Sequence, residues 1–234
     1  MAGSRRLGRE CTLTLPQQPT AANAEILSVE WLFEPFWPGE RLMARIEGSR
    51  ISLSDEHGQP VAGEMAAVAS VLEGSIRADQ ALVDGVWTAQ PFAGEEAAGL
   101  RAFVAVDLVD IDGQALHQVP LQERRRLLES VVEEGTQVRL SPLVKHPLRG
   151  WLSGWRANGF SHYLAKHQNS PYRPGERNDD WLKIPIRPDT PVGLLGGVIG
   201  TRERTRRIRD RGSSVLPSDS PSSHPPTTDR GGSS

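Results

Sequence analysis

The sequence predicts an α+β domain that spans residues 25–186. Apolar, β-branched stretches alternate irregularly with stretches of helical periodicity, and this pattern ends where proline and glycine become frequent after Pro185. The hydrophobic content of 37% is enough for one core once the flanking segments are set aside. We expect a disordered leader over residues 1–24 and a basic, Pro/Ser/Gly-rich disordered tail over residues 187–234.

The first half of the domain has mainly the pattern of strands. Residues 42–48 and 50–54 are joined by Gly48 and Ser49, which predicts a β-hairpin. Residues 62–76 carry apolar side chains at helical spacing and predict a helix. Residues 81–88 and 101–111 are β-branched and apolar, so we expect two more strands, the second buried on both faces.

The second half begins with a helix. Apolar residues recur on one face of residues 121–132, which is typical of an amphipathic helix. Residues 138–144 predict a strand and residues 148–158 a further helix. Residues 170–183 then combine a turn fixed by two prolines and a glycine with basic side chains and a short apolar strand, a pattern suited to holding phosphate.

Composition restricts the cellular setting and the partners. Cys11 is the only cysteine, so there is no internal disulfide and no cysteine metal cluster, and a reducing cytoplasm is the expected location. No apolar run reaches the ~20 residues of a membrane span, so we expect no membrane partner. From Thr201 on, seven arginines and four acidic residues give a charge of +3, whereas the preceding residues carry −5.

Five motifs, in order, closely resemble the adenylation domain of ATP-dependent DNA ligases, especially the bacterial end-joining repair type. Together they run from Glu34 to Lys183 without a large gap. They are Glu34-Pro35-Phe36-Trp37-Pro38-Gly39-Glu40-Arg41, Leu82-Val83-Asp84-Gly85, Val106-Asp107-Leu108-Val109-Asp110-Ile111-Asp112-Gly113, Pro120-Leu121-Gln122-Glu123-Arg124-Arg125 and Ser170-Pro171-Tyr172-Arg173-Pro174-Gly175-Glu176-Arg177-Asn178-Asp179-Asp180-Trp181-Leu182-Lys183.

The resemblance implies an ATP-grasp-like nucleotidyltransferase fold with antiparallel sheets and flanking helices. The family attaches AMP to a lysine, passes it to a DNA 5′-phosphate and seals the nick. An active ligase of this type also carries an OB-fold domain after the closing strand. The stretch after Lys183 is too short and of the wrong composition for that barrel, so no OB-fold domain is expected.

The departures from the family pattern fall on the residues that the chemistry needs. Phe36 stands where the family has its nucleophilic lysine, and no lysine precedes Lys145. By the same resemblance, the nucleophile-orienting acid is replaced by Pro38 and the two metal-binding glutamates by Val86 and Ser161. The remaining replacements are Glu56 for the ribose-contacting arginine, Val106 for the adenine-stacking aromatic and Pro185 for a second closing lysine. We therefore predict no catalytic residue and no bound metal.

Phosphate-binding charge is retained. The resemblance assigns nucleotide or phosphate contacts to Arg41, Lys166 and Lys183, and it also retains Trp181. Each cation taken singly is more typical of a solvated surface charge than of a ligand contact, and Trp181 is more typical of a core or loop anchor than of a ligand platform. A compact arginine run in the tail is a candidate nucleic-acid contact, with a solvated tail as the alternative. It consists of Arg202, Arg204, Arg206, Arg207, Arg209 and Arg211.

Acidic and histidine residues give weaker signals. Asp107, Asp110 and Asp112 alternate along a strand that ends in Asp-Gly, a pattern more typical of a turn than of a cation site. His162 and His167 flank Lys166 but lack partners at the spacing of metal ligands.

Three functions follow as hypotheses. The first is a degenerate ligase-like protein that does not self-adenylate, needs no cofactor, and binds DNA or a DNA-repair protein. The second is an ATP-dependent DNA ligase, active alone or with a partner chain, with ATP and Mg²⁺ as cofactors. The third is a sensor that holds ATP without reacting, against which Glu56 and Val106 argue because they disfavour the triphosphate and the adenine ring.

Overall fold

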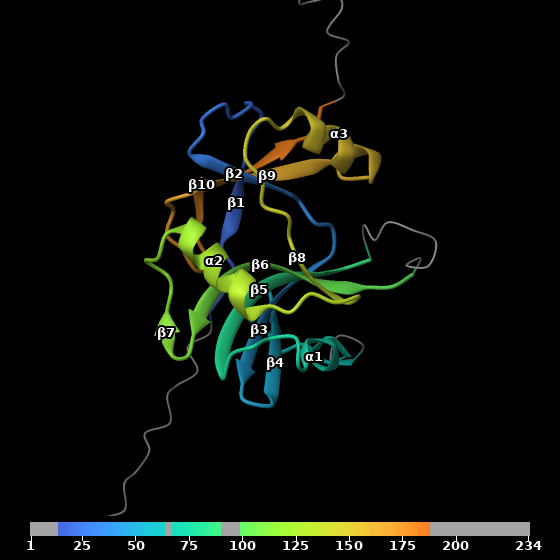
Figure 1. The fold of residues 1–234 in the computed structure, drawn as a ribbon, viewed down its shortest axis with the longest axis vertical. Coiled ribbons are helices and arrows are strands. Elements are labelled where there is room, and N and C mark those ends of the chain that lie inside the picture. Colours follow the sequence, from blue (N-terminus) through green and yellow to red (C-terminus); the bar gives the residue numbers. More distant parts are fainter. Residues whose placement is uncertain (1–13, 64–66, 90–98, 188–234) are drawn as a thin grey trace, which may run out of the picture. The chain divides into compact units, whose positions relative to one another are not determined.

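A computed structural model describes residues 14–63, 67–89 and 99–187. Within these residues the chain forms two sheets and three helices (Figure 1). The strands are short, mostly antiparallel and interrupted by few helices, as the sequence predicts for an α+β domain. Among the described residues, no helix has the length and apolar composition that crossing a bilayer requires.

The larger sheet has the strand order β4-β3-β5-β6-β7, and β8 adds to β6 in parallel. Its hairpin closes at Gly48, whose φ of 59° suits a residue without a Cβ. The predicted hairpin and the strands predicted over residues 81–88 and 101–111 are confirmed, whereas the strand predicted over residues 138–144 ends at Leu140. The strands are β3 (Glu40–Glu47), β4 (Arg50–Asp55), β5 (Gln80–Thr88), β6 (Ala102–Ile111), β7 (Gln114–Ala115) and β8 (Val138–Leu140).

Helices α1 (Ala67–Leu72) and α2 (Leu121–Val131) contribute to the core of this sheet. α2 buries Leu128 and Val131 against it, so the apolar face predicted for residues 121–132 is the packed face. α1 buries Val68 and Leu72 but is shorter than the helix predicted over residues 62–76. Residues 64–66 lie outside the described residues.

The smaller sheet has the order β1-β10-β9-β2. Its strands are β1 (Gln18–Ala21), β2 (Trp31–Pro35), β9 (His162–His167) and β10 (Arg177–Pro185). Helix α3 (Arg149–Ala157) packs on it through Trp155, in a cluster with Phe33, Phe160 and Ile184.

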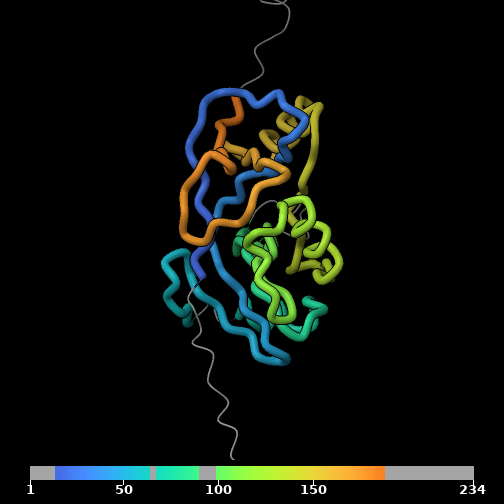
Figure 2. Tube along the Cα trace, turned by 90° about the vertical axis from the view of Figure 1, so that its left-hand side faces the viewer, coloured from blue at the N-terminus to red at the C-terminus, as the bar shows by residue number. Residues whose placement is uncertain are grey.

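The prediction of a disordered leader over residues 1–24 is wrong for its described part. β1 pairs in parallel with β10, the amide of Gln17 donates to the Tyr172 hydroxyl at 3.1 Å, and Gln17 is fully buried. Figure 2 shows this blue segment running beside the orange β10. The strand has no hydrophobic period because backbone hydrogen bonds to a distant partner hold it. Residues 1–13, and the predicted tail from Pro188 to Ser234, lie outside the described residues.

A small cluster joins the two sheets. Tyr172 and Trp181 from the β9–β10 region pack against Met43, Leu82 and Val109 of the larger sheet, and all five side chains are buried. The two rings meet edge to face, with centroids 5.9 Å apart. The loop of residues 170–183 is thus anchored in the core, and Trp181 is the core anchor that the sequence favoured.

The acidic residues at the end of β6 lead into a turn at Asp112. Arg124 of α2 holds Asp107 with two hydrogen bonds of 2.8 and 2.9 Å, and both side chains are fully buried. Asp112 has a φ of 48° and accepts a hydrogen bond from the Gln80 amide at 3.2 Å. Among the described residues, no group of three or more histidine, cysteine or acidic side chains is placed to hold a metal ion.

Replacing Gly85 by alanine should destabilise the larger sheet. A Cβ at Gly85 would lie 2.2 Å from the Phe103 ring, which is itself fully buried. Overpacking of this kind costs about 1–3 kcal/mol, measurable as a lower urea midpoint. Gly150→Ala, on an open helix position, is the matched control and should stabilise by about 0.5–1 kcal/mol. Equal midpoints for the two variants would contradict the packing described for Phe103.

Replacing Arg124 by methionine should leave the buried Asp107 carboxylate without its partner. Removing one member of a fully buried ion pair costs about 3–5 kcal/mol, so the free energy of unfolding should fall by that amount. Arg126→Gln, which breaks an exposed pair with Glu123 on the same helix, should change it little. Equal urea midpoints for the two variants would contradict a stabilising role for the buried Arg124–Asp107 pair.

Candidate functional site

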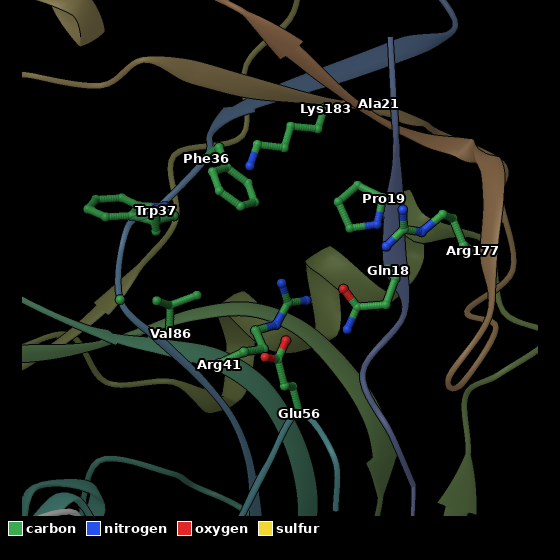
Figure 3. A pocket seen from close by; sticks show the side chains of 11 residues that line it. Gln18, Pro19, Ala21, Phe36, Trp37, Arg41, Glu56, Val86, Arg177 and Lys183 are labelled. Atoms are coloured by element: carbon green, nitrogen blue, oxygen red, sulfur yellow. The ribbon is translucent and has the colours of Figure 1, made fainter.

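A cavity of about 360 Å³ lies where β1, β3 and β10 approach one another (Figure 3). Its size is at the lower end of the range of small-molecule sites, roughly 300–1,000 Å³. Its lining comes from both sheets and from the segment that joins β2 to β3. The lining residues are Gln18, Pro19, Ala21, Phe36, Trp37, Gly39, Arg41, Glu56, Val86, Arg177 and Lys183.

Three cations and one carboxylate face this cavity. Arg41 comes from β3, whereas Arg177 and Lys183 come from opposite ends of β10. Glu56 follows β4, and Figure 3 shows its side chain among those that line the cavity. The lining thus has a small surplus of positive charge, which favours anionic ligands.

Arg41 is fixed by a buried carboxylate. Its Nη2 donates to Asp84 Oδ2 at 2.6 Å and its Nε donates to Oδ1, so one edge of the guanidinium is engaged by a fully buried partner. Burial opposes the charge of Arg41, but Asp84 outweighs burial and raises the pKa of Arg41 above its ordinary value. Arg41 is therefore a permanent, oriented cation at the cavity wall.

Tyr172 completes the group around Asp84. Its hydroxyl donates to Asp84 Oδ2 at 2.8 Å. Burial, and then the negative charge of Asp84, raise the pKa of Tyr172 well above its ordinary value, so the phenol stays protonated and remains a donor. Asp84 thus receives hydrogen bonds from β3 and from the β9–β10 loop at once.

Lys183 lies over Phe36, the residue that the resemblance aligns with the family's nucleophile. Its Nζ is 3.6 Å from the centroid of the Phe36 ring, a cation–π contact that Figure 3 shows inside the cavity. Burial lowers the pKa of Lys183. Burial, and then the charge of Lys183, also lower the pKa of His162, whose Nδ1 lies 2.9 Å from the Ser161 hydroxyl.

Lys166 lies outside the cavity lining, in the core. Its Nζ is 2.6 Å from Glu34 Oε1 and 3.8 Å from the centroid of the Trp181 ring, and the lysine side chain is fully buried. The sequence grouped Lys166 with Arg41 and Lys183 as a phosphate ligand. The fold brings Arg41 and Lys183 together in the cavity, but it pairs Lys166 with a carboxylate that the sequence did not single out.

Two further departures from the family pattern also line the cavity. Val86 and Glu56 face it, so an apolar group and a carboxylate stand where the resemblance places a metal ligand and a ribose contact. Ser161 lies beyond the lining and contacts His162, and Val106 is buried. The run from Arg202 to Arg211 lies outside the described residues, so its predicted role in nucleic-acid binding stays a prediction.

Sequence reasoning missed Arg177, Gln18 and Asp84 as parts of the site. Arg177 was visible within the basic loop and stands in register with Gln18 of β1, a pairing that only the fold reveals. Asp84 was visible as the acid of the Leu82–Gly85 motif. A buried carboxylate among apolar strand residues needs a cationic partner, and that requirement was the available signal.

Comparison with known proteins agrees with this geometry. Residues 88–184 match the family model described as the ATP dependent DNA ligase domain. A DNA ligase from Thermococcus onnurineus is 24% identical over 230 residues, which cover 87% of this chain and 41% of that protein. The multifunctional non-homologous end joining protein LigD of Mycobacterium bovis is 25% identical over 169 residues, covering 68% of this chain and 22% of the relative. The chain thus spans less than half the length of these relatives.

Solved structures give the same fold. The ligase domain from Mycobacterium tuberculosis LigD aligns with a TM-score of 0.61 and 24% identity, over 73% of this chain and 58% of that one. Mycobacterial DNA ligase D complexed with ATP aligns with the same TM-score at 23% identity, over 74% and 60% of the two chains. The predicted resemblance is confirmed: this chain is similar in sequence to ATP-dependent DNA ligases, those of LigD among them, and its described residues have the fold of the LigD ligase domain.

Proposed function

We propose that this protein is a ligase-like domain that does not self-adenylate and that binds DNA. The observation that carries the proposal is the arrangement at the nucleophile position. The resemblance places Phe36 at that position, and the ammonium of Lys183 lies 3.6 Å from the centroid of its ring. A benzyl group has no lone pair with which to attack a phosphorus atom.

The remaining requirements of adenylation also lack their groups. Attack on an α-phosphate forms a phosphoramidate, and the developing charge on the phosphoryl oxygens is stabilised mostly by metal ions held by carboxylates. Pro38, Val86 and Ser161 provide no carboxylate at the positions that the resemblance assigns to these acids. Among the described residues, no group of three or more histidine, cysteine or acidic side chains is placed to hold a metal.

DNA is the proposed partner because cations line the cavity and because the chain is similar to DNA ligases. Arg41, Arg177 and Lys183 form a cationic lining that suits phosphate. The relatives are DNA ligases and an end-joining protein, which gives DNA preference over other polyanions. A DNA-repair protein is the further partner that the LigD relatives suggest.

The alternative is an ATP-dependent DNA ligase that is active alone or with a partner chain. Lys183 favours it, because the lysine lines the cavity and burial lowers its pKa, which makes a neutral amine more accessible. Under this alternative ATP and Mg²⁺ are cofactors, and Lys183 rather than Phe36 carries the AMP.

Incubation with ATP labelled on its α-phosphate and with Mg²⁺ should give no protein–AMP band on a denaturing gel. The reason is the missing amine at position 36 together with the missing carboxylates. An intact ligase treated in parallel is the positive control. A labelled band would overturn the proposal, and its disappearance in Lys183→Arg would establish the alternative.

Phe36→Lys alone should leave the protein unable to form the AMP adduct. The new amine would stand next to Lys183, but Pro38, Val86 and Ser161 still supply no metal ligand, and an adenylation barrier without metal stabilisation remains high. The same label assay measures the outcome, with circular dichroism to verify folding. Adduct formation by this single variant would show that the lost lysine is the sole defect and that the carboxylates are dispensable.

A further inference from the structure

We propose that the exposed face of α3 binds single-stranded DNA, with a base stacked on Trp151 and phosphates held by Arg149 and Arg156. All three residues belong to α3, and none of them is among the residues that line the cavity. This surface is therefore a second contact, separate from the cations on which the proposed function rests.

Trp151 presents an aromatic surface to solvent and is supported from behind. Trp151 is 47% exposed, whereas Trp155, one turn later in α3, is buried in the core of the smaller sheet. The centroids of the two rings are 6.2 Å apart, and the ring planes are tilted by 39°. Because Trp155 holds Trp151 from the protein side, the ring can accept a base with little loss of conformational freedom.

Arg149 and Arg156 lie along the other border of the exposed face. They are seven positions apart, which is about two helical turns, so they stand one above the other on α3. The face that carries Trp155 packs against the core, and by helical periodicity Ser153 lies between the arginines and Trp151 on the exposed side. A strand that crosses α3 can therefore place phosphates at the arginines while one of its bases reaches Trp151.

The positive charge of α3 is not balanced by neighbours in sequence. The chain contains no aspartate or glutamate between Glu134 and Glu176, a stretch that includes the whole of α3. Arg149 and Arg156 are exposed, and none of the ion pairs among the described residues involves either of them. Such charges attract phosphates, and each phosphate that they neutralise releases counterions from the strand.

These features favour a single strand over a duplex or a protein helix. Bases in a duplex stack on one another, whereas a single strand offers its base faces to an exposed ring. A partner helix needs several apolar anchors on successive turns. The exposed face of α3 has Trp151 as its large apolar side chain, and Gly150, Ser153 and Gly154 are the other exposed positions near it. One aromatic ring beside two arginines is typical of a stacking surface for single strands.

Fluorescence anisotropy of the full chain with a labelled oligothymidylate tests the stacking contact. The probe should have about 16 nucleotides, the upper end of the length that one binding domain covers, and a duplex of equal length is the second probe. Trp151→Ala should weaken binding of the single strand about fivefold or more, since stacking of one base on an aromatic ring is typically worth at least that much. Duplex binding should change less than about twofold, because a paired base does not stack on the ring. Trp151→Phe keeps an aromatic ring and should keep most of the single-strand affinity.

Two matched sets of variants test the charge of the surface. Ser153→Glu should weaken single-strand binding about fivefold, the effect of one charge repelling another at contact distance in water, whereas Ser153→Gln, of the same size, should not. Arg149→Gln and Arg156→Gln should each lower the slope of log affinity against log salt concentration by about 0.7. Arg139→Gln, which replaces an exposed arginine of β8 in the same acid-free stretch, is the control and should leave the slope unchanged. Urea midpoints equal to that of the unmodified chain verify that the variants fold.

The outcomes separate this inference from the proposed function. Unchanged single-strand affinity in Trp151→Ala, or equal affinities in the two Ser153 variants, overturns the inference and leaves the proposed function standing if duplex DNA binds and no protein–AMP forms. Polyglutamate that displaces the labelled strand as well as unlabelled oligothymidylate does would assign the surface to acidic polypeptides and overturn the assignment to DNA. A protein–AMP band refutes the proposed function and leaves the result for α3 in place, and absence of binding to both probes contradicts the two together.

Discussion

The buried carboxylate of Asp84 is the constraint on which the rest of the site depends. A fully buried carboxylate is stable only if hydrogen bonds and charge compensate its lost hydration. Arg41 supplies the charge from the neighbouring strand, and Tyr172 supplies a phenol from the loop before β10. Satisfying Asp84 therefore requires the two sheets to meet, and this meeting encloses the cavity between them.

The need to compensate buried carboxylates also explains why some cations of the chain lie in the core while others line the cavity. Lys166 balances the negative charge of Glu34 in the core, and Arg124 balances that of Asp107. Both cations therefore stabilise the fold through buried ion pairs. Arg41 is shared, since Asp84 engages one edge of it while its side chain lines the cavity. Lys183 has an aromatic ring as its close neighbour, and Arg177 stands at the start of β10. Cations that the resemblance groups together as phosphate contacts therefore have different surroundings in the fold.

Most of the fold could be predicted from local pattern, and the site could be predicted in part. The Gly48 hairpin, the apolar face of residues 121–132 and the buried strand of residues 102–111 follow from periods of two and 3.6 residues, which act over short range. β1 has no such period, because its partner lies about 160 residues downstream in the register of Gln18 with Arg177. The alignment of Phe36 with the family's nucleophile could be made from a sequence motif. The burial of Lys166 could not be predicted in this way, because it depends on Glu34 of a strand that pairs with it across the sheet.

The pairing of β1 with β10 also has a consequence for synthesis of the protein. The first described strand finds its partner in the last described strand, so the smaller sheet cannot close while β10 is still inside the ribosome. Contacts of such long sequence separation form late, because the chain must close a large loop before they are made. The larger sheet, whose neighbours are mostly consecutive in sequence, can assemble first. During translation the larger sheet would therefore be folded while the smaller sheet is incomplete and has an unpaired strand edge. Chaperone binding protects such a state against aggregation.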